Sequence, residues 1–383
     1  MTVRRRVALV AAFGLLAAAC NDAGAAPPST KTSASTTTTT STTSTTTSTT
    51  STTSTTSTTS TTSTTAVATS TTAGATAAAE YPALTVAAYE LTADALALSV
   101  TVHRPGVEPW TLAAGWRNDG GPVASDTPFV VASVSKLVTA LSIARLVERG
   151  ELTTDTLVPW TAMGIAHDPA WDDVTVRELL DHTSGMPINR KSWLDDPGPC
   201  SVPLEEAMAT PPVLTRGTWT YSNGNYCALG LVVQHITGQS LDDAAYDLVF
   251  DPAGITGPYL STDGTHRDAA PYAKGLARLS RLGGAGTWLM STDDLAAMLD
   301  AVTPADRETL RWPGIIQDQY GWGHTGTLDG AKACAWVLDD GATVAAVVSG
   351  PTPASGGDLC DVVVVALAAD LGISRGDPIR TPL

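Results

Sequence analysis

Basic residues are scarce in this sequence of 383 residues, where 22 lysines and arginines face 38 aspartates and glutamates, giving a formal net charge of −16. Because no basic patch is available, nucleic acid is not an expected partner. Lysine is the rarest charged residue, with five in the whole chain, so the position of each one is informative. Beyond the first 19 residues, no apolar run is long enough to cross a bilayer as a helix.

The first 19 residues are typical of a signal peptide for export. Three arginines at 4–6 precede an apolar run at 7–19, which is too short for a stable membrane helix. The run ends in three alanines and Cys20, which resembles the bacterial lipoprotein cleavage box and predicts a diacylglyceryl anchor on Cys20. The alternative is ordinary signal cleavage nearby, with Cys20 incidental. We therefore expect an exported protein of the cell envelope, bound to the membrane through a lipid.

Threonine, serine and alanine make up almost all of residues 29–79. Such a tract has too little apolar surface to offset the entropy lost on ordering it. We expect a disordered stalk over 20–79, either O-glycosylated or bare, and one folded domain over 80–383.

Cysteine is also sparse, and four of the five cysteines lie in the expected domain. An even number in an exported protein predicts two disulfides, with three possible connectivities. The pairs nearest in sequence are favoured, each closing a loop of about 27 residues that stabilises by roughly 3 kcal/mol. Free thiols are the alternative, since the spacings match no zinc pattern. The favoured pairs are Cys200 with Cys227 and Cys334 with Cys360.

Strand patterns lie at both ends of the domain, and helical patterns lie between them. Alternating apolar residues predict one hairpin over 96–116 and another over 331–350, while 356–371 is typical of a last helix. The middle, about 155–300, is helical and rich in loops. The sequence therefore predicts an α+β fold: an antiparallel sheet formed by both chain ends, flanked by helices, with an inserted mostly helical region.

Ser133 begins an apolar helix, and Lys136 follows one helical turn later. Residues three apart share one helix face, so the lysine can reach the serine. A serine hydroxyl becomes a nucleophile when a base takes its proton, and a lysine serves as that base only if its pKa is lowered. The alternative is that Ser133 is simply the N-cap of the helix.

Two further motifs follow this pair: Tyr-Ser-Asn at 221–223, before an apolar helix, and His-Thr-Gly at 324–326. With three motifs in order, the chain resembles the penicillin-recognising serine hydrolases, which include class C β-lactamases, D-alanyl-D-alanine carboxypeptidases and related esterases. The resemblance covers roughly 90–371 and implies a β-lactamase/transpeptidase-like fold. Class C β-lactamases usually begin the third motif with lysine, so His324 is closer to the carboxypeptidase and esterase branches.

The resemblance implies a catalytic role for three side chains. Ser133 would be the acylated nucleophile and Lys136 its proton partner. Tyr221 would act as general base or relay protons with Lys136, and the sequence leaves open which of the two takes the first proton. The backbone N–H groups of Ser133 and Thr327 would form the oxyanion hole.

Other residues are implied as substrate contacts. Asn223 would hydrogen-bond the substrate or Lys136, and His324 would provide a donor or a cation at the edge of the site. The hydroxyls of Thr325 and Thr327 would contact the substrate. No metal or organic cofactor is implied, and the expected partner is a small molecule or a peptide, such as a peptidoglycan stem peptide.

Some features are interpreted as structural or depart from the family pattern. His182 is interpreted as structural, and Asp293 and Asp294 as charges in the first turn of a helix that Ser291 or Thr292 caps. Relatives place a separate strand before the third motif, whereas "QYGWGHTG" runs the two together, so a strand is expected to be missing or merged. In carboxypeptidase-like relatives that strand can carry a basic residue that grips the substrate's carboxylate; here the nearest arginine upstream is Arg311.

These observations predict a serine hydrolase that forms an acyl-enzyme on Ser133. The leading expectation is a D-alanyl-D-alanine carboxypeptidase-like enzyme acting on cell-wall peptides. An esterase or β-lactamase of the same fold is the alternative among enzymes. A non-catalytic surface protein that binds cell-wall peptides or β-lactams is the alternative of another class.

Overall fold

The computed structural model describes residues 80–188, 191–194, 196–261, 266–311 and 315–373. The expected signal peptide, the lipidation site at Cys20 and the expected stalk lie outside the described residues. None of the described helices combines the length and the hydropathy that a membrane span requires.

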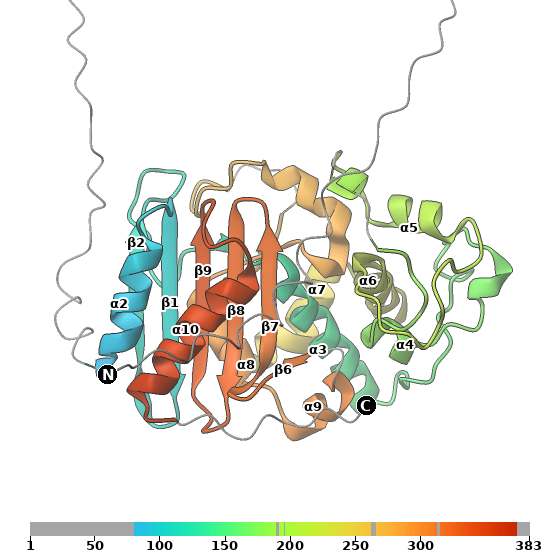
Figure 1. The fold of residues 1–383 in the computed structure, drawn as a ribbon. Helices are drawn as coiled ribbons and strands as arrows, with labels where there is room; N and C mark the ends of the chain where they lie inside the picture. The colour runs from blue at the N-terminus through green and yellow to red at the C-terminus, as the bar shows by residue number, and fades with distance from the viewer. Residues whose placement is uncertain (1–79, 189–190, 195, 262–265, 312–314, 374–383) are drawn as a thin grey trace, which may run out of the picture. The chain divides into compact units, whose positions relative to one another are not determined.

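Six antiparallel strands form the main sheet, in the spatial order β2-β1-β9-β8-β7-β6 (Figure 1). The first and last parts of the chain meet where β1 pairs with β9, so the predicted α+β fold with a sheet built from both chain ends is confirmed. The strands are β1 (Ala97–Arg104), β2 (Val107–Gly115), β6 (Ile316–Gln317), β7 (Gly321–Leu328), β8 (Ala331–Leu338) and β9 (Thr343–Ser349).

The strand expected to be missing is present in a shortened form. β6 contains two residues, and it pairs with the start of β7 through Ile316–Gly323 and Gln317–Trp322. The Tyr-Gly-Trp-Gly stretch and the His-Thr-Gly motif do run together, because Gly321–Leu328 is one continuous strand. Two residues show no alternation of polar and apolar side chains, which is why the pattern gave no signal for β6.

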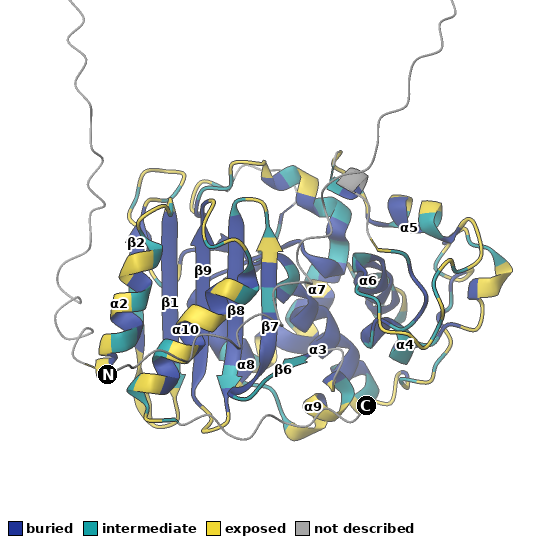
Figure 2. Cartoon of the chain, in the orientation of Figure 1, coloured by how far each residue is buried: buried dark blue, intermediate teal, exposed yellow. Residues whose placement is uncertain are grey.

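Helices cover both faces of the sheet, so β1, β8 and β9 are buried along most of their length (Figure 2). One face packs against α2 (Pro82–Leu91) and α10 (Gly356–Asp370), which lie side by side (Figure 1). The other face packs against α8 (Thr292–Asp300). Because successive side chains of a strand point to opposite faces, alternate residues of each strand belong to the two different hydrophobic cores.

Asp370, at the end of α10, holds the start of α2. Its carboxylate accepts hydrogen bonds from the backbone N–H groups of Ala83 and Leu84, each at 2.9 Å. The first N–H groups of a helix have no acceptor within the helix, so Asp370 of α10 caps the N-terminus of α2. Tyr81 packs edge-on against Trp110 of β2, with ring centroids 5.5 Å apart.

The region between the two parts of the sheet is mostly helical, as expected, and it also holds a small sheet in the order β3-β5-β4. α8 lies within the expected insertion but packs on the main sheet, where Thr292 contacts Ser99 and Thr101 of β1. The elements are α3 (Ser135–Glu148), α4 (Val176–Leu180), α5 (Ser201–Met208), α6 (Asn223–Thr237), α7 (Leu241–Ala245), α9 (Pro304–Leu310), β3 (Phe129–Val130), β4 (Tyr259–Leu260) and β5 (Trp288–Met290).

Local sequence explains why these helices begin and end where they do. Ser291 caps α8 in a capping box with Asp294, which agrees with the prediction for Ser291 and for the acids of the first turn. Thr292 is the first residue of the helix rather than its cap, because its hydroxyl bonds to β1. α6 begins after Ser222 and ends at Gly238, whose φ of 69° suits glycine.

Both predicted disulfides are present. Cys200 bonds to Cys227 and thereby ties the start of α5 to α6. Cys334 bonds to Cys360 and ties β8 to α10. The second bond shows that the Cys334 side chain lies on the α10 face of β8. Residues of β7 that pair with Cys334 and its alternate neighbours therefore direct their side chains to the same face.

Candidate active site

Ser133 lies in a short 3-10 turn (Ala132–Val134) that leads directly into α3. Its side chain caps neither helix, so the N-cap interpretation does not hold. Ala132, one residue earlier, has a φ of 48° and is 1% exposed. A residue with a Cβ rarely adopts this conformation, which persists because the packed surroundings enforce it. The strain therefore lies next to the serine hydroxyl.

Lys136 is buried and bonded on three sides. Its Nζ lies 3.1 Å from Oγ of Ser133, and 2.7 Å from both Oδ1 of Asn223 and the backbone oxygen of Ala285. The side chain is 1% exposed, and burial lowers its pKa well below the ordinary value for lysine. The carbonyl of Ala285 comes from a segment that no motif marked, so sequence reasoning missed it.

Tyr221 reaches the same serine from the segment before α6. Its hydroxyl donates to Oγ of Ser133 at 2.7 Å, and Nζ of Lys136 lies 4.9 Å from its ring centroid. Burial raises the pKa of Tyr221 to about 12, and the hydrogen bond to Ser133 opposes that shift in part. The phenol is therefore protonated at neutral pH.

Strand β7 approaches the serine turn very closely at Gly326. A Cβ at this position would lie 2.2 Å from the backbone oxygen of Val131 and 3.2 Å from Cβ of Ala132. Only glycine permits this distance, so the His-Thr-Gly motif lies against the turn that carries Ser133. His324 is two residues away on the same face of the strand.

His324 is a buried side chain of this site, and its contact with substrate as a donor or a cation stays a prediction. The ring is 5% exposed, and its Nδ1 lies 2.6 Å from the backbone oxygen of Thr325. A carbonyl only accepts, so Nδ1 carries the proton and Nε2 is left as an acceptor. Burial, with the nearby charge of Lys136, lowers the pKa of His324 to about 3.

The side chains of Thr325 and Thr327 lie on the other face of β7 from Gly326, and their contact with substrate stays a prediction. Thr325 pairs across the strands with Cys334, whose side chain bonds to α10. The hydroxyl of Thr327 accepts a hydrogen bond from the backbone N–H of Gly356, at the start of α10, at 2.8 Å. Both side chains therefore lie on the α10 face, opposite Gly326. The role of the backbone N–H of Thr327 in the oxyanion hole likewise stays a prediction.

His182 lies beneath the tyrosine rather than beside the serine. Its ring centroid is 4.7 Å from that of Tyr221 and 5.1 Å from that of Tyr226. Arg311, the nearest upstream arginine, is exposed at the end of α9. In the described part of the chain, no group of three or more histidine, cysteine or acidic side chains is arranged to hold a metal ion.

A serine in contact with a buried lysine and a tyrosine, at the edge of an antiparallel sheet packed with helices, defines the class of serine hydrolases of the β-lactamase fold. The chain belongs to the Beta-lactamase family, whose sequence pattern matches residues 85–368.

Relatives of this chain differ in the names they carry. It is 34% identical over 146 residues to Penicillin-binding protein 4 of Amycolatopsis lactamdurans, covering 36% of this chain and 38% of that protein. It is 33% identical over 179 residues to Esterase EstB of Burkholderia gladioli, covering 42% and 45%. The matched segments therefore span less than half the length of either relative.

Solved structures agree with this fold. A D-stereospecific amidohydrolase from Streptomyces sp. matches with a TM-score of 0.62 at 21% identity, covering 76% of this chain and 99% of that one. The D-amino acid amidase from Ochrobactrum anthropi SV3 matches with the same TM-score and identity, covering 75% and 99%. At this identity the likeness concerns the fold alone.

Proposed function

We propose that this protein hydrolyses amide or ester bonds through an acyl-enzyme on Ser133. The observation that carries the proposal is the set of three contacts around Nζ of Lys136, with Ser133, Asn223 and Ala285. A neutral amine has two N–H donors and one lone pair. Two of the three contacts are carbonyl oxygens, which only accept, so they take both donors and leave the lone pair directed at the Ser133 hydroxyl.

The two candidate bases differ in how burial affects them. It lowers the pKa of Lys136 well below its ordinary value, and it raises the pKa of Tyr221 to about 12. Opposite shifts in neighbouring groups distinguish a base from an acid. We therefore assign the first proton transfer to Lys136, and we assign Tyr221 as the proton donor to the leaving group.

The reaction then has two steps. Oγ of Ser133 attacks the substrate carbonyl carbon while its proton moves to Lys136, and the carbonyl electron pair moves onto oxygen, near the N–H groups of Ser133 and Thr327. The bond to the leaving group breaks, and that group takes a proton from Tyr221, which regains one from Lys136. Water attacks the acyl-enzyme in the same way, which releases the acid and restores Ser133.

The first candidate substrate is a cell-wall peptide of the D-Ala-D-Ala type, which would make the protein a carboxypeptidase. A penicillin-binding protein among its relatives and amidases of D-configured substrates among its structural neighbours support this candidate by analogy. Such a substrate ends in a carboxylate, which a cationic side chain would bind well.

The second candidate is an ester or amide without a terminal carboxylate. His324 favours it, because burial lowers the pKa of the ring to about 3 and the contact of Nδ1 with a carbonyl leaves Nε2 as an acceptor rather than a charge. An acceptor repels a carboxylate and binds an N–H or O–H group instead. An esterase among the relatives is consistent with this candidate.

Active-site labelling tests the acyl-enzyme directly. The purified protein is treated with a fluorophosphonate probe and with a fluorescent penicillin, beside Ser133→Ala and the matched control Ser135→Ala. We expect labelling in the wild type and the control and none in Ser133→Ala. If neither probe labels folded wild-type protein, the acyl-enzyme is rejected in favour of a non-catalytic binding protein.

A substrate panel then separates the branches. It contains a D-Ala-D-Ala peptide, a p-nitrophenyl ester and nitrocefin, and kcat/KM is measured for each. Release of D-alanine identifies a carboxypeptidase, ester cleavage alone an esterase, and nitrocefin turnover a β-lactamase.

We also propose that the protein is exported and held at the cell envelope by a lipid on Cys20. The two disulfides support an oxidising compartment. Metabolic labelling with an alkyne fatty acid, compared between wild type and Cys20→Ala, tests the anchor. Equal labelling of the two proteins would reject it.

A further inference from the structure

Tyr221 is flanked by two backbone N–H groups that both bind the same residue. The N–H of Thr220 donates to the backbone oxygen of His182 at 2.8 Å. The N–H of Ser222 donates to Nδ1 of the His182 ring at 3.3 Å. His182 therefore holds the chain immediately before and immediately after the tyrosine whose hydroxyl contacts Ser133.

His182 is itself fixed in an unusual conformation. Its φ is 55°, in the left-handed region that few residues other than glycine adopt, and its side chain is 2% exposed. This backbone turn directs both its carbonyl oxygen and its ring toward the segment 220–222. The Nδ1 atom receives a second hydrogen bond, from Nδ2 of Asn225 at 3.0 Å, and Asn225 is bonded in turn to Ser184.

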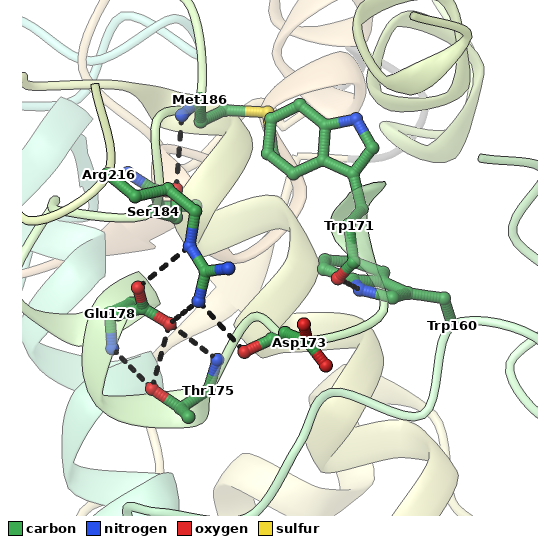
Figure 3. Close-up of polar contacts among 9 residues, drawn as sticks. Trp160, Trp171, Asp173, Thr175, Glu178, Ser184, Met186 and Arg216 are labelled. Atoms are coloured by element: carbon green, nitrogen blue, oxygen red, sulfur yellow. Dashed lines mark hydrogen bonds and ion pairs between the residues drawn. The ribbon is translucent and has the colours of Figure 1, made fainter. Parts of the chain in front are cut away.

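The helix before His182 is tied down by an ion pair. Figure 3 shows the guanidinium of Arg216 against the carboxylate of Glu178, with nitrogen–oxygen distances of 3.0 and 2.7 Å. Glu178 also closes the capping box of α4 with Thr175. Gly217, beside Arg216, donates its N–H to the backbone oxygen of Thr183 at 2.8 Å. The segment that leads to Tyr221 is therefore bonded to α4 and to Thr183 through residues 216 and 217, in addition to its contacts with His182.

His182 does not have the properties of a second base. Its Nδ1 lone pair already receives the N–H groups of Ser222 and Asn225. Burial lowers its pKa well below the ordinary value, with the nearby Lys136 adding to that shift. A neutral ring that accepts at Nδ1 is suited to holding a backbone segment.

We infer that His182 is a positioning residue for catalysis, and that its Nδ1 acceptor fixes Tyr221 at hydrogen-bonding distance from Ser133. The inference rests on the proposed function, because it assigns Tyr221 a part in acylation. It concerns the acceptor atom rather than the aromatic ring. Two variants separate these: His182→Asn keeps an acceptor at the same number of bonds from Cα and tolerates positive φ, whereas His182→Phe keeps a ring and loses the acceptor.

The first measurement is the rate of labelling by the fluorophosphonate. We expect His182→Phe to label about 10- to 100-fold more slowly than wild type, and His182→Asn to stay within about threefold. A rate in His182→Phe equal to that of wild type would overturn the inference, and so would equal losses in both variants. Thermal unfolding of each variant separates a loss of folded protein from a loss of rate.

A double-mutant cycle tests whether His182 acts through the tyrosine. In a Tyr221→Phe background, we expect His182→Phe to change the labelling rate by less than about twofold, because the group that it positions is already removed. Losses that multiply in the double mutant would mean that His182 acts independently of Tyr221, and would reject the positioning role.

A third measurement does not need activity. Hydrogen exchange of the Ser222 amide should be faster in His182→Phe than in wild type or His182→Asn, since only the first lacks its acceptor. If wild-type protein is not labelled by any probe, the acyl-enzyme fails while this measurement still decides whether His182 holds the segment. Equal protection of the Ser222 amide from exchange in all three proteins would show that His182 does not hold this segment.

Discussion

Nζ of Lys136 lies 2.7 Å from Oδ1 of Asn223, an amide oxygen that carries no charge. Replacing this amide by a carboxylate of the same shape adds a negative charge and exchanges the Nδ2 donor for an acceptor. An anion at this distance favours the ammonium form of Lys136 and raises its pKa. The structure therefore provides a way to test the protonation of the lysine without removing it.

We expect Asn223→Asp to lower kcat/KM at neutral pH by about 10-fold or more, because less of the lysine is then neutral. The loss should shrink as the pH is raised through the new lysine pKa. In wild type, kcat/KM should rise with pH up to the depressed pKa of Lys136 and then level off. A pH profile for Asn223→Asp that does not move to higher pH would contradict Lys136 as the base.

Tyr221→Phe tests the donor assigned to the leaving group. The variant removes the hydroxyl that lies 2.7 Å from Oγ of Ser133. A p-nitrophenolate leaves without taking up a proton, whereas an amine needs one. We therefore expect kcat/KM to fall far more for an anilide than for a p-nitrophenyl ester with the same acyl group. The measurement is the ratio of the two kcat/KM values. Equal losses would instead indicate that Tyr221 acts in the attack by Ser133.

His324 should destabilise the folded protein as the pH falls. Its folded pKa of about 3 lies below the ordinary value of 6.5, so between these pH values the unfolded chain binds the proton more readily. The free energy of unfolding should therefore decrease from pH 6.5 downward, by at most about 1.4 kcal/mol per pH unit for this group. The free energy of unfolding of His324→Gln, measured by urea denaturation, should depend less on pH in that window than that of wild type, and an equal dependence would contradict the lowered pKa.

His324→Lys should change substrate preference rather than acylation itself. It adds a cation where the native ring is neutral, so we expect kcat/KM to rise for substrates that bear a carboxylate relative to neutral esters. The comparison uses two aryl esters that differ only in a carboxylate on the leaving group. An unchanged ratio would mean that residue 324 does not contact that part of the substrate.

Gly356 and its neighbour Gly357 offer a matched pair at the start of α10. A Cβ at Gly356 would lie 2.3 Å from the backbone oxygen of Gly326, whereas at Gly357 the only neighbour is Oγ of Ser355 at 3.4 Å. We expect Gly356→Ala to destabilise the protein by about 1–3 kcal/mol and to slow acylation, because the helix presses on the strand behind Ser133. Gly357→Ala should be neutral or slightly stabilising in denaturant unfolding.

Patterns in short stretches of sequence predicted the elements that depend on neighbouring residues alone. The spacing of Ser133 and Lys136, the two hairpins, the last helix and the disulfide pairs needed only short-range information. The direction of Thr325 and Thr327 was also available, because a strand that directs His324 inward must direct its neighbours outward. This alternation places both hydroxyls on the α10 face, and their contact with substrate stays a prediction.

Other parts depend on contacts between distant segments. The carbonyl of Ala285 meets Lys136 across 149 residues of sequence, and backbone atoms leave no signature in a motif. The hydrogen bonds that His182 forms with Thr220 and Ser222 depend on its left-handed backbone conformation, which the presence of a histidine in the sequence does not predict. The protonation of His324 follows from burial, which a single strand pattern does not reveal.

The cap that Asp370 places on α2 determines how force would enter the domain. The described chain begins at that helix, on the sheet face opposite Gly326, and α2 is held by α10, which is itself cross-linked to the sheet through Cys360. Tension applied at residue 80 would therefore pass along α10 into β8. Because Gly356 at the start of α10 also lies against Gly326 of β7, the same path reaches the strand that packs on the serine turn, so pulling from this end should disturb acylation before the domain unfolds.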